Sequence, residues 1–177
     1  MCDFLEVAKR RQASRGFSDQ PVEHEKLVNC AEAARLAPSG CNAQPWSFVV
    51  VETPEKVAEV AKCSQQLGMN GWTDTAKAFV IVFEEHAVLM PGIRTLVPSQ
   101  FFAKTDMGGA VLSVCLEAET QGLGSCILGV YDREKICEII GVPVEKQFGG
   151  LIAIGYPANP AIREKSRKSF DDVVTFV

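Results

Sequence analysis

The spacing of apolar residues predicts five helices along the chain. In each stretch, apolar side chains recur three or four positions apart, which is the spacing of one buried helix face. The predicted helices are a short one from Phe4 into the basic run KRRQASR, Glu23 to Leu36, one that begins at Thr53-Pro54, one capped by Asp106 and ended by Gly122, and Asp132 to Ile140.

Four short apolar runs between these helices read as buried strands. They are SFVVV, AFVIVF, CILGV and GLIAIGYP, at residues 47–51, 78–83, 126–130 and 150–157. Residues 84–104 show no clear period and contain two prolines. Helices alternating with strands favour an α/β sheet with helices on its faces, but this pattern fixes neither strand order nor strand direction.

Length and charge narrow the class of protein. The 177 residues predict one domain or the repeating unit of an oligomer. The longest apolar runs, FVVV and FVIVF, fall well short of the roughly 18 residues of a membrane span, and the N-terminus lacks the apolar core of a secretory signal. We therefore expect a cytoplasmic protein with no membrane partner. A net charge of -4 argues against nucleic acid as a partner.

Cysteine and histidine usage predicts no metal site. The seven cysteines include no C-x-x-C pair and are interpreted as buried, reduced thiols, while two histidines are too few for a histidine-rich site. The chain also lacks the G-x-S-x-G, Walker and H-E-x-x-H motifs. Gly122 and Gly124 follow a helix and precede a strand, the reverse of the dinucleotide-binding order, so we interpret them as a helix cap and a turn. An enzyme of this composition would rely on a bound cofactor.

Two basic clusters and one loop indicate which cofactor. Arg10, Arg11 and Arg15 follow the first helix, and the run REKSRK, residues 163–168, lies near the C-terminus. Either cluster alone is typical of a solvated face, but together they predict a bound phosphate. The loop APSGCNAQPWSF, residues 37–48, carries more prolines and amides than a connection needs.

Six segments resemble the nitroreductase superfamily of FMN-dependent oxidoreductases, and they follow that family's order along nearly the whole chain. They are RRQASRGFSDQPV, APSGCNAQPWSFVVV, QLGMNGWTDTAKAFVIV, DMGGAVLSVCLEAETQGLGSCILGVYD, IAIGYPANP and REKSRKSFDDVV. The resemblance implies an α+β fold with a mostly antiparallel central sheet flanked by helices, and this replaces the parallel-sheet expectation. It further implies that residues 1–177 form one FMN-binding domain of an intertwined homodimer, with about 160–177 extending over the partner chain.

The resemblance also implies roles for particular residues. Arg11, Arg15, Lys165 and Arg167 match the cations that hold the FMN phosphate. Gln12 and Ala13 replace a frequent His or Arg and a Ser, which leaves backbone contacts there. The remaining matches are Pro38, Ser39, Gly40 and Asn42 in the loop laid against the partner's flavin, with Gly40 in place of a frequent Ser, Asn70 at the pyrimidine edge of the ring, and Leu128 and Gly129 where a strand end approaches the flavin N5.

Several positions keep two interpretations. Cys41 is either a buried thiol, the interpretation we favour, or a group facing the substrate side of the ring. Phe101 and Phe102 either line the substrate pocket or pack at the dimer interface. Asn70 is also the first residue of an Asn-Gly turn pair. For Trp46 and Pro45, we favour roles in the core and in shaping the loop over contact with a ligand.

The activity implied by the resemblance is a ping-pong hydride transfer through the flavin. NADH or NADPH would reduce bound FMN at N5, and a nitroaromatic, quinone, enone or free flavin would then be reduced in the same place. This scheme needs no catalytic side chain and no metal. A non-catalytic FMN-binding, storage or sensing protein is the alternative, motivated by the altered Gln12-Ala13 pair and Gly40.

Overall fold

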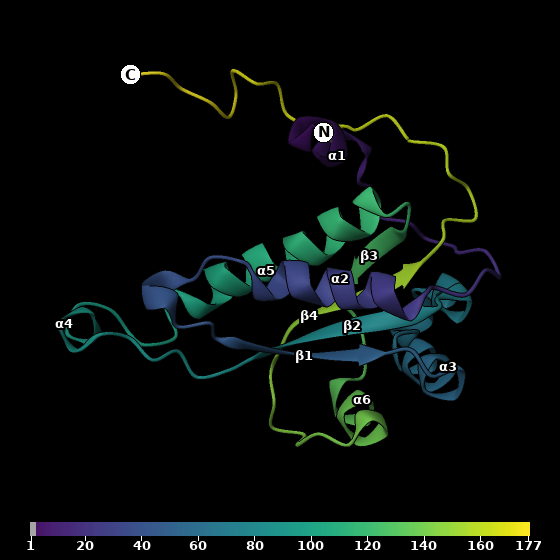
Figure 1. Cartoon of the computed structure of the whole chain (residues 1–177), viewed down its shortest axis with the longest axis horizontal. Helices are drawn as coiled ribbons and strands as arrows, with labels where there is room; N and C mark the ends of the chain where they lie inside the picture. Colours follow the sequence, from purple (N-terminus) through teal and green to yellow (C-terminus); the bar gives the residue numbers. More distant parts are fainter. Residues whose placement is uncertain (1–2) are drawn as a thin grey trace.

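The computed structural model describes residues 3–177 and places a four-stranded sheet between two layers of helices (Figure 1). The strands are β1 (Trp46–Val51), β2 (Ala78–Glu84), β3 (Gly124–Leu128) and β4 (Phe148–Gly155), in the order β1-β2-β4-β3. Every neighbouring pair is antiparallel. The α+β prediction is confirmed, and the parallel sheet favoured by alternation alone is wrong.

The connection between β1 and β2 shows why alternation misled. Val51, at the end of β1, pairs with Phe79, near the start of β2. The intervening helix α3 (Pro54–Cys63) therefore leaves and returns at the same end of the sheet, which forces the second strand to run backward. A parallel pair would need the chain to return to the opposite end.

Each face of the sheet has its own apolar core. Helices α2 (His24–Arg35) and α5 (Ala103–Thr120) cover one face, where Val80 and Ile152 belong to the core. Helices α3 and α6 (Arg133–Ile140) cover the other, against Ile81 and Leu151. The two central strands are thus buried on both faces, which explains the unbroken apolar runs AFVIVF and GLIAIG.

The remaining elements are short. Helix α1 (Phe4–Arg10) lies beside the C-terminal end of α5, where Arg10 Nε donates to Glu119 Oε1 at 3.0 Å. Three single 3₁₀ turns, Gly40–Asn42, Gln66–Gly68 and Gly71–Thr75, occupy loops. Residues 84–104, which show no periodic pattern, contain α4 (Pro91–Arg94). Gln100 links the later part of this stretch to its beginning, because its Oε1 accepts from the amide of Ala87 at 2.8 Å. No helix within residues 3–177 is long and apolar enough to cross a bilayer.

Some predicted boundaries are corrected. Helix α5 begins at Ala103, so Asp106 lies within its first turn and is not its N-cap. The Thr53 side chain makes no capping bond, although Pro54 does open α3 as predicted. Strand β3 begins at Gly124, because Gly124 pairs with Gly155 across the sheet, and Gly124 is therefore not a turn residue. Gly122, with φ of 76°, ends α5 as predicted.

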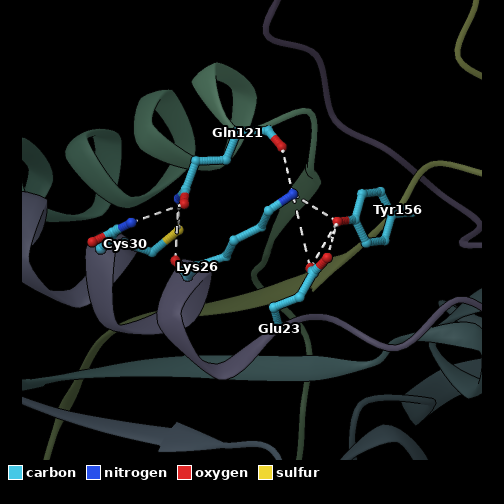
Figure 2. Close-up of polar contacts among 6 residues, drawn as sticks. Glu23, Lys26, Cys30, Gln121 and Tyr156 are labelled. Carbon is cyan, nitrogen blue, oxygen red and sulfur yellow. Dashed lines mark hydrogen bonds and ion pairs between the residues drawn. The ribbon is translucent and has the colours of Figure 1, made fainter.

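A polar network fixes the point where the chain leaves β4 (Figure 2). Lys26 Nζ, on α2, donates to the carbonyl of Gln121 at 3.1 Å and to Tyr156 Oη at 2.6 Å. The Tyr156 hydroxyl in turn donates to Glu23 Oε2 at 2.7 Å. This hydrogen bond is the largest of the effects that lower the pKa of Glu23. The network therefore ties α2 and the end of α5 to the first residue after β4.

Candidate cofactor-binding site

The segment after α1 lies on the free edge of β3. The amide of Ser14 donates to the carbonyl of Ser125 at 2.9 Å, and Phe17 forms a bridge with Pro157. A Cβ on Gly124 would come within 2.5 Å of Ser14 Oγ, and one on Gly155 within 2.7 Å of the Phe17 ring. The two facing glycines are needed because any larger residue would push this segment off the sheet.

The stretch after α1 that lies along the edge of β3 is called the crossing segment, and the stretch after β4 is called the C-terminal segment. Residues 11–15 of the first and residues 163–167 of the second together form a pocket of about 350 Å³. All six residues predicted to surround a phosphate line it, namely Arg11, Gln12, Ala13, Arg15, Lys165 and Arg167. Arg163, Glu164 and Ser166 complete the lining. The two basic clusters, about 150 residues apart in sequence, thus meet as predicted. The predicted site does not include Arg163, although its place in the run REKSRK is a signal for including it.

The pocket is built for an anion. Five cations and one carboxylate line it. Burial, together with the neighbouring Arg11 and Arg167, lowers the pKa of Lys165 below its usual value. Guanidinium groups stay charged at any physiological pH and bind phosphate through paired N–H donors. The donor set therefore fits a phosphate group.

The strand β3 leads from this pocket to the other predicted ring contacts. Leu128 is three residues beyond Ser125, or about 10 Å along an extended strand. Leu128 is buried, whereas Gly129 is exposed at the strand end. Asn70 Nδ2 donates to the carbonyls of Ser64 and Val130, at 3.1 and 3.4 Å, so Asn70 lies beside the chain just past Gly129. The structure thus brings Asn70, Leu128 and Gly129 together at one end of β3.

Asn70 has a structural role in addition to any ligand contact. Its φ of 58° lies in the left-handed region, as the turn interpretation predicts, and its carbonyl accepts from the amide of Thr73 at 2.9 Å. Because the side-chain hydrogens are directed to Ser64 and Val130, only the carboxamide oxygen is left for a ligand. At the predicted pyrimidine edge, Asn70 could therefore offer an acceptor and no side-chain donor.

The loop of Pro38, Ser39, Gly40 and Asn42 lies elsewhere in this chain. The amide of Gly40 donates to Asp106 Oδ2 at 3.1 Å, at the start of α5, whereas the cation pocket lies near Glu119 at its end. These two helix positions are 13 residues apart, which corresponds to about 20 Å at 1.5 Å per residue. One chain therefore does not join the loop to the pocket.

One prediction within that loop is corrected. Cys41 is exposed and has a left-handed backbone, with φ of 55°, so the favoured buried thiol is wrong. The Gly40 amide donates to Asp106 and its carbonyl accepts from Ala43, which leaves the second lone pair of the carbonyl for a ligand. Trp46, only 8% exposed, belongs to the core as predicted.

The other cysteines and the phenylalanine pair follow their packing. Among the described residues, the remaining cysteines, Cys30, Cys63, Cys115, Cys126 and Cys137, are buried as predicted, and Cys2 lies outside them. Phe102 packs against a small cluster of Ala87, Leu89 and Ala103 and lies 3.1 Å from where a Gly40 Cβ would be. Phe101 is 62% exposed. Phe102 thus packs within its own chain, and of this pair only Phe101 is largely exposed.

Comparison with known proteins gives a consistent result. The profile described as "Nitroreductase family" matches residues 8–156. A Streptococcus pyogenes protein with the provisional name NAD(P)H nitroreductase Spy0809 is 56% identical, over 86% of this chain and 89% of its own. Rat iodotyrosine deiodinase 1 is 23% identical, over 99% of this chain and 70% of its own.

Solved structures show the same fold. A protein of Exiguobacterium sibiricum, crystallised in complex with FMN under the provisional name nitroreductase, superimposes with a TM-score of 0.84 at 23% identity. The superposition covers 100% of this chain and 98% of that one. A nitroreductase family protein from Streptococcus pneumoniae gives 0.82 at 24% identity, over 99% and 100% of the two chains. The family profile spans most of the chain, including the crossing segment and β3, so this chain belongs to the nitroreductase family.

Proposed function

We propose that the protein is an FMN-dependent oxidoreductase that takes electrons from NADH or NADPH. The observation that carries the proposal is the pocket of five cations at the free edge of β3. Support comes from the Streptococcus pyogenes relative, which is named for NAD(P)H, and from the Exiguobacterium structure, which was solved with FMN.

The residues of the chain hold and orient the cofactor in this proposal. Arg11, Arg15, Arg163, Lys165 and Arg167 bind the phosphate through charge-assisted hydrogen bonds. The end of β3, at Leu128 and Gly129, and the carboxamide oxygen of Asn70 receive the ring. Bound FMN would supply the redox chemistry that links the nicotinamide to an acceptor. No side chain has to titrate for this, in keeping with the absence of a catalytic motif.

A homodimer completes the site in this proposal. The loop containing Ser39 and Asn42 is about 20 Å from the cation pocket of its own chain, by the rise of α5. A second copy, packed antiparallel along α5, would bring its own loop to that pocket. Exposed apolar side chains support such packing, since Leu112 on α5 and Ile127 on β3 are 49% and 51% exposed.

The acceptor belongs to the class of small oxidised molecules, namely nitroaromatics, quinones, enones or free flavin. Cys41 and Phe101 are exposed near the loop that would face the partner's cofactor, and we propose them as substrate-side contacts. The partly apolar, partly sulfur-bearing surface that they offer suits a flat, weakly polar ring.

Stopped-flow mixing of the FMN-loaded protein with NADH and with NADPH tests the proposal. We expect bleaching of the flavin absorbance, followed by its return when a quinone or nitroaromatic is added. Tight FMN binding without bleaching by either nucleotide would instead support the storage or sensing alternative. A purified protein that is colourless and stays so after addition of FMN would contradict both.

A further inference from the structure

Gln12 lines the cation pocket, but its side chain is directed at protein backbone. Its Nε2 donates to the carbonyl of Ala161 at 2.8 Å. Its Oε1 accepts from the backbone amide and from Nε of Arg163, both at 3.1 Å. Arg163 Nη2 donates back to the carbonyl of Ala13 at 2.6 Å. The carboxamide thus pairs with residues 161–163 much as a neighbouring strand would.

This pairing matters because backbone bonds hold only the beginning of the C-terminal segment. Residues 156–165 run antiparallel to residues 9–18, and backbone hydrogen bonds link Ser18 to Tyr156 at 2.8 Å and Ala158 to Gly16 at 3.2 Å. Within the described part of the chain, no backbone-to-backbone bond joins 159–168 to any other segment. In that stretch, hydrogen bonds from side chains hold the segment instead. Gln12 and Arg163 donate to backbone carbonyls across the two segments, and Lys165 Nζ donates to the carbonyl of Lys9.

Docking this segment is opposed by charge. It carries Arg163, Lys165 and Arg167 toward Arg11 and Arg15, with only Glu164 among the lining residues to offset them. Like charges in a shared pocket repel, and a phosphate dianion at their centre converts that repulsion into attraction. Figure 1 shows the same segment, in yellow, leaving β4, passing α1 and continuing to the free C-terminus.

We propose that Gln12 is a positioning residue that seats residues 161–167 and is not itself a phosphate ligand, so that phosphate binding and docking of the C-terminal segment form one coupled equilibrium. The identity of the phosphate as that of FMN rests on the proposed function. Reciprocity then requires that FMN stabilise the docked segment as much as the docked segment favours FMN. Because residues beyond 167 would reach the partner chain, the cofactor would also influence dimer assembly.

Hydrogen exchange on the full-length protein tests the coupling. Amide exchange in residues 159–168 is measured without ligand and with FMN, riboflavin or inorganic phosphate, while flavin fluorescence reports binding. We expect FMN to slow exchange there and riboflavin, which lacks the phosphate, to leave it unchanged. Phosphate alone at high concentration is expected to give partial slowing.

A double-mutant cycle separates positioning from direct contact. We expect Gln12→Ala to weaken FMN binding roughly tenfold, and Gln12→Ala added to Arg163→Ala to cost little more than Arg163→Ala alone, because both act through one segment. Riboflavin affinity is expected to stay unchanged in Gln12→Ala. Gln20→Ala is the matched control, since the Gln20 side chain is exposed in the same N-terminal stretch and is expected to leave FMN affinity unaltered.

The outcomes distinguish this inference from the proposed function. FMN binding without slower exchange in 159–168, or additive effects of Gln12→Ala and Arg163→Ala, would overturn the inference and leave the function standing. Protection by inorganic phosphate with no binding of FMN would support the coupling and overturn the function. Failure of FMN to bind, together with exchange that neither FMN nor phosphate changes, would overturn both.

Discussion

Arg11 is the cation whose position owes least to the C-terminal segment. It is the C-cap of α1, where its backbone amide donates to the carbonyl of Val7 at 2.8 Å, and the residue is half-buried at the pocket. Because the helix holds its backbone, replacement of the side chain would remove the proposed phosphate contact without removing a support. This makes Arg11 the cleanest single-residue probe of the site.

We expect Arg11→Ala to lower FMN affinity while leaving the fold intact. One charge-assisted hydrogen bond contributes about 1.5 to 3 kcal/mol, so the dissociation constant should rise about 10- to 100-fold. Flavin fluorescence titration measures the affinity, and circular dichroism the fold. Arg94→Ala, an exposed arginine on α4, is the matched control. An affinity unchanged in Arg11→Ala would show that the phosphate is held elsewhere.

Gly124 probes the contact between the crossing segment and β3. An added Cβ would lie 2.8 Å from Ser14 Cβ and 2.5 Å from Ser14 Oγ, so the backbone of the segment has to shift and not merely a flexible tip. Overpacking of this kind costs about 1 to 3 kcal/mol of unfolding free energy. We expect Gly124→Ala to lose that stability in urea titrations and to bind FMN more weakly. Gly92→Ala, where a Cβ would meet open space, should show neither effect.

The sequence predicted elements better than it predicted directions of side chains. The helices and strands followed from period and caps, because a buried face imposes its spacing wherever it packs. Antiparallel strand direction came only with the family resemblance, since α3 can return to either end of the sheet. The surroundings of Gly40 could not be predicted, because they are set by Asp106 and Phe102, which are more than 60 residues away. The direction of the Gln12 side chain could not be predicted for the same reason, because its partners lie near residue 161.

Helix α5 separates two kinds of contact that the sequence had placed in one site. Its first turn binds the loop around Gly40 through Asp106, and its last turn binds α1 through Glu119. Beyond its end, Gln121 joins the network of Lys26 and Tyr156 (Figure 2). The helix therefore fixes the positions of the loop, the cation pocket and the start of the C-terminal segment relative to one another.

Tyr156→Phe tests the network through its pH dependence. The Tyr156 hydrogen bond lowers the pKa of Glu23 from the usual 4.5, so the stability it contributes is present above that value and is lost as pH falls through the lower folded-state pKa. Lys26, whose pKa is raised, loses its contribution only above 10.5. We expect Tyr156→Phe to have a lower thermal midpoint than the parent protein near neutral pH.

That difference should shrink as the solution is made acidic. Thermal unfolding followed by circular dichroism, from about pH 7 down to about pH 3, measures it for both proteins. The mildly acidic range below 4.5 is where the two curves should converge. A gap between the midpoints that stays constant through this range would show that Glu23 is not the group coupled to Tyr156.

Residues 166–177 connect the single chain to the proposed dimer. Within the described chain, their hydrogen bonds are local, as when the amide of Val174 donates to the carbonyl of Phe170 at 2.9 Å. Phe170, Val173 and Phe176 are 63%, 62% and 85% exposed. An apolar groove between α2 and β1, lined by Leu27, Val28 and Phe48 among others, offers a surface of matching character on a second copy.

A chain that ends at Lys168 keeps every residue of the cation pocket and lacks this apolar end. Burial of a single Phe or Val side chain contributes about 1.5 to 3 kcal/mol, so we expect the dimer dissociation constant to rise at least about tenfold. Sedimentation velocity at several concentrations measures it.

Full-length protein with Phe170, Val173 and Phe176 all changed to Ser should behave like the shortened chain, because it loses the same apolar surface. Asp171→Asn with Asp172→Asn should remain dimeric, since both side chains are exposed and polar. A shortened chain as dimeric as the parent would contradict a role for the end in assembly and would leave α5 as the main interface.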